Sequence, residues 1–368
     1  MLWKNYLQSR YGVESLQEFK GCFSDKAFKA ENSRGRRLSS DDPRYSDEDE
    51  LFGGVVDPFL FDLNKILQSK AYRRLRDKTQ VFIGTENCHI TTRLKHTSEV
   101  MAVAMTLADL LGLNVSLVQA IAAGHDIGHG PYGHLGEKIY FSEHHRPFRH
   151  DVFSVVLAQH IERGGRGLNM SYEVLEGISL HSVKTTIMLD KPWEYSTLRV
   201  SDKIGFVFGD INDILRNKFM SVEQFPSLLK DFGENQRERV NRMIAEIVVE
   251  SARQGHLVFE ETELGQKFIQ LKEWVFQNVY KKIDEDFHQS ALKVAYDTVR
   301  NCYPGLESVV WPLLTDREVF ELARLKLHSY AVNRSMLSHF SVTEIVEAFE
   351  LSGRQLDKVD IHELDLNW

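Results

Sequence analysis

The 368-residue sequence is poor in cysteine. Its three cysteines, Cys22, Cys88 and Cys302, are odd in number and far apart, and none belongs to a CxxC pair. A disulfide framework needs paired cysteines and a thiolate zinc site needs clustered ones, so we expect neither. This usage is typical of a reducing compartment, and we predict a cytoplasmic location.

Long apolar runs are also missing. The N-terminal MLWKNYLQSR lacks the apolar core of a signal peptide, and no run approaches the roughly 18 apolar residues that a membrane span needs. We therefore expect no membrane association. The net charge of −8 disfavours a protein that coats nucleic acid, although a local basic patch is compatible with phosphate binding.

Proline and glycine are scarce as well. The chain has 8 prolines and 23 glycines, and residues 227–303 contain no proline. This scarcity argues against a β chain with many turns and predicts an all-α fold with long helices. Apolar residues recur at helical spacing in ten segments: Phe59–Leu75, one from near Thr92 to Gly112, one from Asn114 or Ser116 to His125, Tyr172–Leu180, Leu198–Leu215, Val240–Val249, Phe268–Ile283, Ala291–Val299, Glu318–Leu327 and Val342–Leu351.

The segment 31–50, ENSRGRRLSSDDPRYSDEDE, has almost no apolar content. It is typical of a solvated loop, and a mobile arm over an active site is the second interpretation. We predict three parts: an N-terminal helix with this polar arm (1–50), a core (51–220) and a helical C-terminal region packed on the core (221–368).

Histidine is concentrated in one quarter of the chain, with ten of fifteen between residues 89 and 181. His96 stands near the start of one predicted helix, and His125 and Asp126 end the next. Two antiparallel helices joined by a short turn bring these three side chains together. Asp202, inside an otherwise apolar segment, is a candidate fourth ligand. Two imidazoles and two carboxylates suit Mg²⁺, Mn²⁺, Fe²⁺, Ni²⁺ or Zn²⁺, and the sequence does not choose among them.

A lone helix histidine is more often structural than a metal ligand. The pair His125-Asp126 is harder to explain in that way, because small residues surround it and a buried carboxylate without a cation is costly. His144 and His145, in the polar SEHHRPFRH, are expected at the surface without a role in the site. The sequence leaves His89, His160 and His181 undecided and favours a structural or exposed position for them.

A second group of residues follows directly. His134 and Glu137 are three residues apart, so on a helix the carboxylate can orient the imidazole. General acid–base catalysis requires this arrangement of a base and a group that orients it. His129 and His150 are further candidates near the same site.

Three blocks resemble the H…HD…D signature of the HD-domain metal-dependent phosphohydrolases: RLKHTSEV at 93–100, AAGHDIGHGPYGHLGE at 122–137 and VSDKI at 200–204. Three others resemble the deoxynucleoside triphosphate triphosphohydrolases of the dGTPase type, in their short bacterial form: KAYRRLRDKTQVF at 70–82, FRHDVFS at 148–154 and LNMSYEVLEGISLHS at 168–182. The resemblance covers roughly residues 57–215. It implies an HD-domain helical bundle at 51–220 with additional C-terminal helices.

The resemblance also implies an activity, the hydrolysis of a dNTP to a deoxynucleoside and inorganic triphosphate. Water attacks the α-phosphorus, and the bond from that phosphorus to the 5′ oxygen breaks. By this resemblance the metal ligands are His96, His125, Asp126 and Asp202. The catalytic residues are His134 with Glu137, and His129 and His150 are histidines that line the phosphate site. Arg93 holds the α-phosphate, and Gln80 recognises the 3′ hydroxyl of the deoxyribose. Lys203 and Arg74 would help a divalent metal to offset the charge of the triphosphate.

The implied partners are the dNTP and further copies of the chain, as a hexamer or a dimer. A second nucleotide that acts as an effector and single-stranded DNA are further candidate partners.

The sequence departs from the family pattern at three places. Asp151 replaces an asparagine, and the stretch after Asp202 reads D-K-I-G-F rather than D-E-I-A-Y. The C-terminal block Y-I-A-G-M-T-D has no clear counterpart, and LHSYAVNRSM around Tyr330 is the nearest match.

Two alternatives stand beside a dNTP triphosphohydrolase. The first is another HD phosphohydrolase, acting on nucleoside monophosphates, cyclic nucleotides or guanosine polyphosphates. The second is a sensor of nucleotides or single-stranded nucleic acid, in which the basic segment 70–78 and the arm 31–50 bind without turnover. The intact metal set argues against the sensor.

Overall fold

The computed structural model describes residues 3–39, 41–45, 47–52, 55–82, 87–282, 286–327 and 332–367. Within these ranges the regular structure is helical, and extended pairing is limited to two isolated bridges, Arg36 with Ser171 and Thr79 with Thr92. The all-α fold predicted from the sequence is therefore confirmed. None of the described helices combines the length and the apolar character needed to cross a membrane.

The chain forms two compact units, each built from three stretches of sequence. Unit 1 comprises Met1–Asn32, Ser98–Ala122 and His181–Ile283, and unit 2 comprises Ser33–Thr97, Ala123–Leu180 and Asp284–Trp368. The division into 1–50, 51–220 and 221–368 stays a prediction.

Unit 1 contains five α-helices and four short 3₁₀ turns in its described residues, besides most of α5 (Arg93–Leu111) and α6 (Val115–Gly124). The helices are α1 (Trp3–Tyr11), α11 (Trp193–Arg216), α12 (Leu229–Phe232), α13 (Gln236–Gln254) and α14 (Glu263–Asn278), and the turns are η1 (Leu16–Phe19), η2 (Ala30–Asn32), η5 (Val222–Gln224) and η6 (Tyr280–Lys282).

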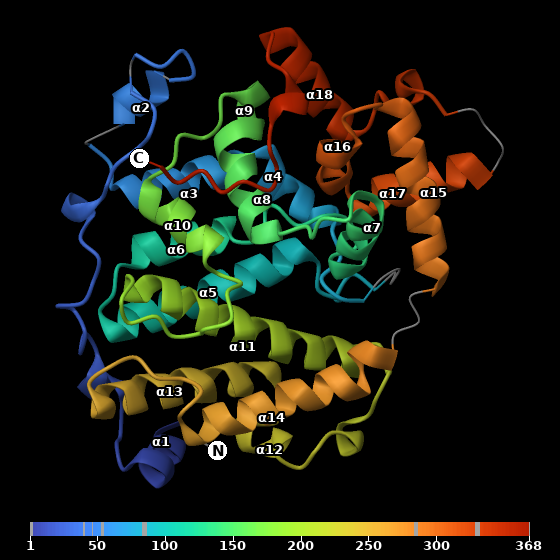
Figure 1. The fold of residues 1–368 in the computed structure, drawn as a ribbon. Helices are drawn as coiled ribbons and strands as arrows, with labels where there is room; N and C mark the ends of the chain where they lie inside the picture. The colour runs from blue at the N-terminus through green and yellow to red at the C-terminus, as the bar shows by residue number, and fades with distance from the viewer. Residues whose placement is uncertain are drawn as a thin grey trace. The chain divides into compact units, whose positions relative to one another are not determined.

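The core of unit 1 lies where α11, α13 and α14 pack side by side (Figure 1). Phe208 of α11 contacts Phe232 of α12 and Phe268 of α14, with ring centroids 5.4 and 5.6 Å apart. Burying aromatic rings in this way supplies much of the free energy that holds three helices together. The segment predicted as Phe268–Ile283 belongs to α14, which starts earlier because Thr262 caps it by accepting the Gly265 N–H; Ile283 lies outside the described residues.

Unit 2 contains the start of α5, the end of α6 and the elements that follow from Ser33 to the C-terminal tail. Its α-helices are α2 (Asp47–Phe52), α3 (Pro58–Gln68), α4 (Lys70–Arg74), α7 (His134–His144), α8 (His150–Val156), α9 (Glu162–Gly165), α10 (Tyr172–Ser179), α15 (Asp286–Cys302), α16 (Glu307–Leu313), α17 (Asp316–Leu327) and α18 (Ser341–Ser352). The 3₁₀ turns are η3 (Leu75–Asp77), η7 (Arg334–Leu337) and η8 (Leu356–Lys358), and η4 (Leu157–Ile161) is a π-helix. In Figure 1, α8 lies beside α10, and α15 lies beside α17.

The α5–α6 pair, which carries the first histidines of the cluster, forms as the sequence predicts. α5 ends at Leu111 because Gly112 adopts a φ of +82°, which favours glycine. Asn114 then caps α6, its side chain accepting the Leu117 N–H at 3.0 Å. These two local signals bring the start of α5 back towards the end of α6.

The polar arm is held against unit 2 by ion pairs, rather than being solvated along its length. Arg36 pairs with the buried carboxylate of Asp62 and donates to the Pro58 carbonyl at 3.0 Å. Asp49 pairs with Lys65, and both side chains are buried. The described part of the arm is therefore fixed by charges that face α3.

Candidate active site

Three predicted metal ligands meet where the start of α5 lies beside the end of α6, inside unit 2. His96 lies in the first turn of α5, and His125 and Asp126 follow the last residue of α6. The Asp126 Oδ2 atom lies 3.9 Å from His96 Nε2 and 3.6 Å from His125 Nε2. All three residues are buried, and their ligand atoms lie within 4.8 Å of one another. Two imidazoles and a carboxylate at this spacing fit a divalent metal ion.

The fourth predicted ligand, Asp202, belongs to unit 1. It is half-buried on α11, in the VSDKI block. Its role as a metal ligand stays a prediction.

Arg93, the first residue of α5, binds the aspartate of this set. Its Nη1 atom donates to Asp126 Oδ2 at 2.8 Å, and both residues are buried. Burial alone raises the pKa of Asp126, but the electrostatic effects of the neighbouring His125, Arg93, His129 and His96 outweigh it and hold that pKa well below its ordinary value. Asp126 is therefore an anion, as a metal ligand must be.

The segment before α5 is attached to Arg93. The Arg93 N–H donates to the Lys78 carbonyl at 2.9 Å, and Arg93 Nη2 donates to the Gln80 carbonyl at 3.4 Å. Gln80 is itself buried. The segment that carries the predicted sugar-binding glutamine thus lies directly beside the predicted phosphate-binding arginine.

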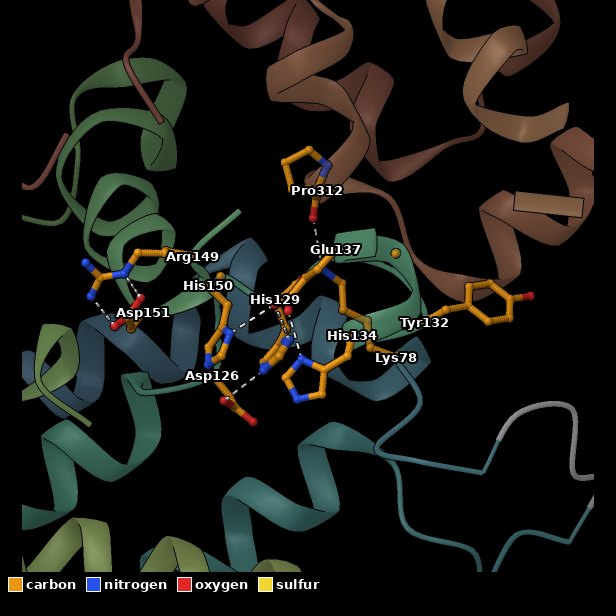
Figure 2. A network of polar contacts seen from close by, with 12 residues as sticks. Lys78, Asp126, His129, Tyr132, His134, Glu137, Arg149, His150, Asp151 and Pro312 are labelled. Carbon is orange, nitrogen blue, oxygen red and sulfur yellow. Dashed lines mark hydrogen bonds and ion pairs between the residues drawn. The ribbon is translucent and has the colours of Figure 1, made fainter. Parts of the chain in front are cut away.

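Glu137 holds the second group of predicted residues together. Its Oε2 atom lies 2.8 Å from His134 Nδ1, and its Oε1 atom lies 3.0 Å from His150 Nδ1 and 3.6 Å from His129 Nδ1. Figure 2 shows the three imidazoles gathered at this carboxylate. His134 is the first residue of α7, so the spacing of three residues works as the sequence predicts.

The charges of this group differ from one member to the next. Burial alone raises the pKa of Glu137, yet its bonds to His134 and His150 outweigh burial and lower that pKa to about 2. Burial opposes a charge on His150, but Glu137 raises its pKa above the ordinary value. His129 is buried, and burial with nearby Arg93 lowers its pKa well below the ordinary value. The set thus pairs an anionic Glu137 with a readily charged His150 and a neutral His129.

The histidine group lies next to the metal set. His129 Nε2 is 3.6 Å from Asp126 Oδ1, and the rings of His129 and His150 stack with centroids 3.7 Å apart. One line of side chains therefore runs from Arg93 through Asp126 to Glu137.

Helix α8, which begins at His150, packs closely against the backbone at Gly128. The Gly128 N–H donates to Ser154 Oγ at 2.9 Å, and that hydroxyl donates to the His125 carbonyl at 3.0 Å. A Cβ atom on Gly128 would lie 2.3 Å from the Ser154 nitrogen, a distance that real Cβ atoms do not show. Glycine is therefore required where α8 passes the His-Asp pair.

The remaining predicted residues lie elsewhere. Arg74 is buried, and burial lowers its pKa below the ordinary value. The nearby carboxylates of Glu162, Glu318 and Glu344 offset part of this effect. Lys203 lies in unit 1, where it pairs with Glu260 at 2.8 Å and contacts Thr186. These surroundings favour structural roles for both cations, and their part in substrate binding stays a prediction.

Asp151, which departs from the family pattern, has a cation beside it. Arg149 Nη2 lies 2.7 Å from Asp151 Oδ2. This pair offsets the extra negative charge close to His150, so the departure does not by itself oppose an anionic substrate. The departure at the C-terminal block, around LHSYAVNRSM, includes residues 328–331, which lie outside the described part of the chain.

The sequence misplaced one histidine and gave little sign of two charged residues at the site. His144, expected to be a surface residue, is half-buried, stacks on Tyr140 and bonds to the Tyr296 hydroxyl. The buried Lys78 and the half-buried Asp316 contact the backbone of the site. For Lys78 the one available signal was its position inside KAYRRLRDKTQVF; for Asp316 there was none.

Comparison with known proteins agrees with this geometry. Residues 93–204 match the HD domain. A deoxyguanosinetriphosphate triphosphohydrolase-like protein from Clostridium perfringens strain 13 is 35% identical over 258 residues, covering 68% of this chain and 75% of the relative. One from Caldanaerobacter subterraneus is 36% identical over 260 residues, covering 70% and 72%. The chain belongs to this family of deoxyguanosinetriphosphate triphosphohydrolase-like proteins.

Proposed function

We propose that the protein hydrolyses a dNTP to a deoxynucleoside and inorganic triphosphate, with a divalent metal held by His96, His125, Asp126 and Asp202. The observation that carries this proposal is the buried His96, His125 and Asp126 set, whose aspartate lies 3.6 Å from His129. The names of the relatives support a deoxynucleoside triphosphate as substrate, with dGTP as the first candidate.

A divalent metal held by these residues would act as a Lewis acid, which polarises the α-phosphate and lowers the pKa of a water molecule. Arg93, already beside Asp126, is placed to hold the same phosphate by its planar guanidinium. Charge on the phosphate oxygens grows as water attacks, so a fixed cation there stabilises the transition state.

In this proposal His134 is the general acid that protonates the leaving 5′ oxygen. Its Nδ1 atom is held by Glu137, which leaves Nε2 as the nitrogen that faces substrate. The oxygen of water forms a bond to the α-phosphorus and the water releases a proton to the solvent. The bond from phosphorus to the 5′ oxygen breaks, and the protonated His134 gives the 5′ oxygen a proton. Glu137 stabilises the imidazolium before the transfer, as general acid catalysis requires.

The product profile tests the proposal. The purified protein is incubated with each of the four dNTPs and with Mg²⁺ or Mn²⁺, and products are separated by anion exchange. Intact triphosphate with deoxynucleoside supports the proposal. Orthophosphate or pyrophosphate would indicate another HD phosphohydrolase, and binding of dNTP without turnover would indicate a sensor. A chelator-treated sample is the control for metal dependence, and a series with Fe²⁺, Ni²⁺ and Zn²⁺ identifies the preferred ion.

The expectations for partners stay predictions. A hexamer or dimer is tested by light scattering, and a nucleotide effector or single-stranded DNA by its effect on the rate of hydrolysis. The cytoplasmic location is likewise a prediction.

A further inference from the structure

The segment Trp311–Asp316 of the C-terminal region lies against the backbone of the site, inside unit 2. Trp311 Nε1 donates to the Gly136 carbonyl at 3.2 Å, in the first turn of α7. The Pro312 carbonyl accepts from Lys78 Nζ at 3.2 Å. The Lys78 Nζ atom also donates to the His129 carbonyl, and Figure 2 shows Lys78 between Pro312 and His129. This segment lies outside the part of the chain that matches the HD domain.

Asp316, the first residue of α17, makes the most specific of these contacts. Its Oδ2 atom accepts the Thr79 N–H at 2.7 Å, and its Oδ1 atom accepts the Tyr132 N–H at 2.7 Å. Thr79 directly precedes Gln80, and Tyr132 lies two residues before His134. A single carboxylate therefore joins two segments that carry predicted site residues and are far apart in the sequence.

The backbone at Tyr132 needs such a partner. Tyr132 has a φ of +56°, in the left-handed region that non-glycine residues rarely adopt, and Gly133 follows with a φ of +55°. A conformation of this kind persists only when its surroundings fix it. Asp316 is half-buried. Desolvation raises its pKa above the ordinary value, and its bonds to Thr79 and Tyr132 and the charge of Lys78 offset only part of that rise.

We propose that Asp316 is a positioning residue for the phosphohydrolase site, one that fixes the turn presenting His134 and the segment carrying Gln80. The C-terminal region is then part of the catalytic apparatus and not only a covering of the core. The effect on catalysis rests on the proposed function, whereas the effect on the backbone does not.

Two variants and one control test this proposal in the full-length, metal-loaded protein. Asp316→Ala removes both acceptors, and Asp316→Asn keeps a single acceptor oxygen. Glu173→Ala is the matched control, because the Glu173 carboxylate likewise accepts two hydrogen bonds, from the Arg34 N–H at 2.8 Å and the Ser33 hydroxyl at 2.5 Å, away from the site segments. The measurements are kcat and KM for the dNTP that the wild type hydrolyses, metal content, and amide hydrogen exchange of peptides spanning 76–82 and 129–135.

For Asp316→Ala we expect kcat to fall roughly tenfold to hundredfold, since small displacements of catalytic groups have effects of this size. KM should change less than kcat, metal content should not change, and both peptides should exchange faster. Asp316→Asn should speed exchange in one peptide and lose less of kcat; it also decides the question if Asp316→Ala does not fold. Glu173→Ala should leave kcat and both peptides as in the wild type.

Three results would overturn the positioning role: an unchanged kcat, a change in KM alone, or a fall in kcat equal to that of Glu173→Ala. If the wild type hydrolyses no dNTP, the proposed function fails, and the exchange of the two peptides still decides whether Asp316 fixes them.

Discussion

Glu137 and His150 are 13 residues apart in the sequence, yet Glu137 Oε1 and His150 Nδ1 lie 3.0 Å apart. The other oxygen of the same carboxylate lies 2.8 Å from His134 Nδ1. One carboxylate therefore fixes the ring orientation of two imidazoles that approach from α7 and α8. This arrangement gives each histidine a defined outer nitrogen, which is what proton transfer and phosphate binding need.

His134→Ala should keep metal and substrate binding but lose most of kcat. The expected fall is roughly 10²- to 10⁴-fold, because general acid–base assistance is worth about that much. Steady-state kinetics with metal analysis measures both effects. His339→Ala is a matched control, since His339 forms an exposed pair with Glu321 at 3.1 Å outside the site. A retained kcat in His134→Ala would remove the catalytic assignment.

His125→Ala and Asp126→Ala should each lose the metal and the activity together. Removing a direct ligand should cost more than the roughly 10- to 100-fold loss of affinity that follows a change in a supporting group. Metal content after dialysis, measured by mass spectrometry, checks the expectation, with His134→Ala as the variant that keeps its metal. Full metal content in Asp126→Ala would show that the ion binds elsewhere.

Arg93→Ala should raise KM and also lower kcat, because in the proposed function the guanidinium holds the α-phosphate, and it pairs with Asp126 at 2.8 Å. Arg93→Lys keeps the charge but loses the planar pair of donors, so it should recover only part of the activity. We expect a loss of roughly tenfold or more in kcat/KM for the alanine variant. Equal kcat/KM in wild type and Arg93→Ala would place the residue outside the site.

Stability should depend on pH through Glu137. Its pKa in the folded protein is about 2, below the ordinary value of 4.5. The unfolded chain therefore takes up the proton first as pH falls, and the stabilisation is present above about pH 4.5 and lost down to about pH 2. The full contribution is on the order of 3 kcal/mol.

Urea unfolding of the chelator-treated protein at pH 6, 5, 4 and 3 measures this effect. Glu137→Gln should be less stable than the wild type at pH 6, and the difference should shrink as pH falls, because a protonated glutamic acid resembles glutamine. A difference that stays constant over this range would contradict the assignment.

Local signals account for what the sequence predicted well. Helical periodicity, Gly112 and Asn114 place the α5–α6 pair, and the spacing of three residues places His134 beside Glu137. One such prediction failed: the segment from Phe59 to Leu75 is not one helix. It breaks at Ser69, whose extended backbone ends α3 and whose side chain accepts the Tyr72 N–H to start α4. Apolar spacing does not register a polar capping residue in the middle of a periodic run.

Long-range contacts account for what the sequence could not predict. The bond from His150 to Glu137 depends on how α8 packs, and Asp316 contacts Tyr132 across 184 positions of sequence. His144 bonds to Tyr296 of α15, so a polar neighbourhood in the sequence was a poor guide to its burial. Such pairs are set by tertiary packing, for which a single sequence carries no periodic signal.

The contact between Gly128 and Ser154 also determines a spacing inside the site. Because no side chain separates the two backbones, α8 lies close enough for His150 to stack on His129 at 3.7 Å. Adding a single methyl group at Gly128 would push α8 outwards and open that stack. Substitution at Gly128 should therefore be poorly tolerated, and the distance between the His129 and His150 rings depends on a residue that has no side chain of its own.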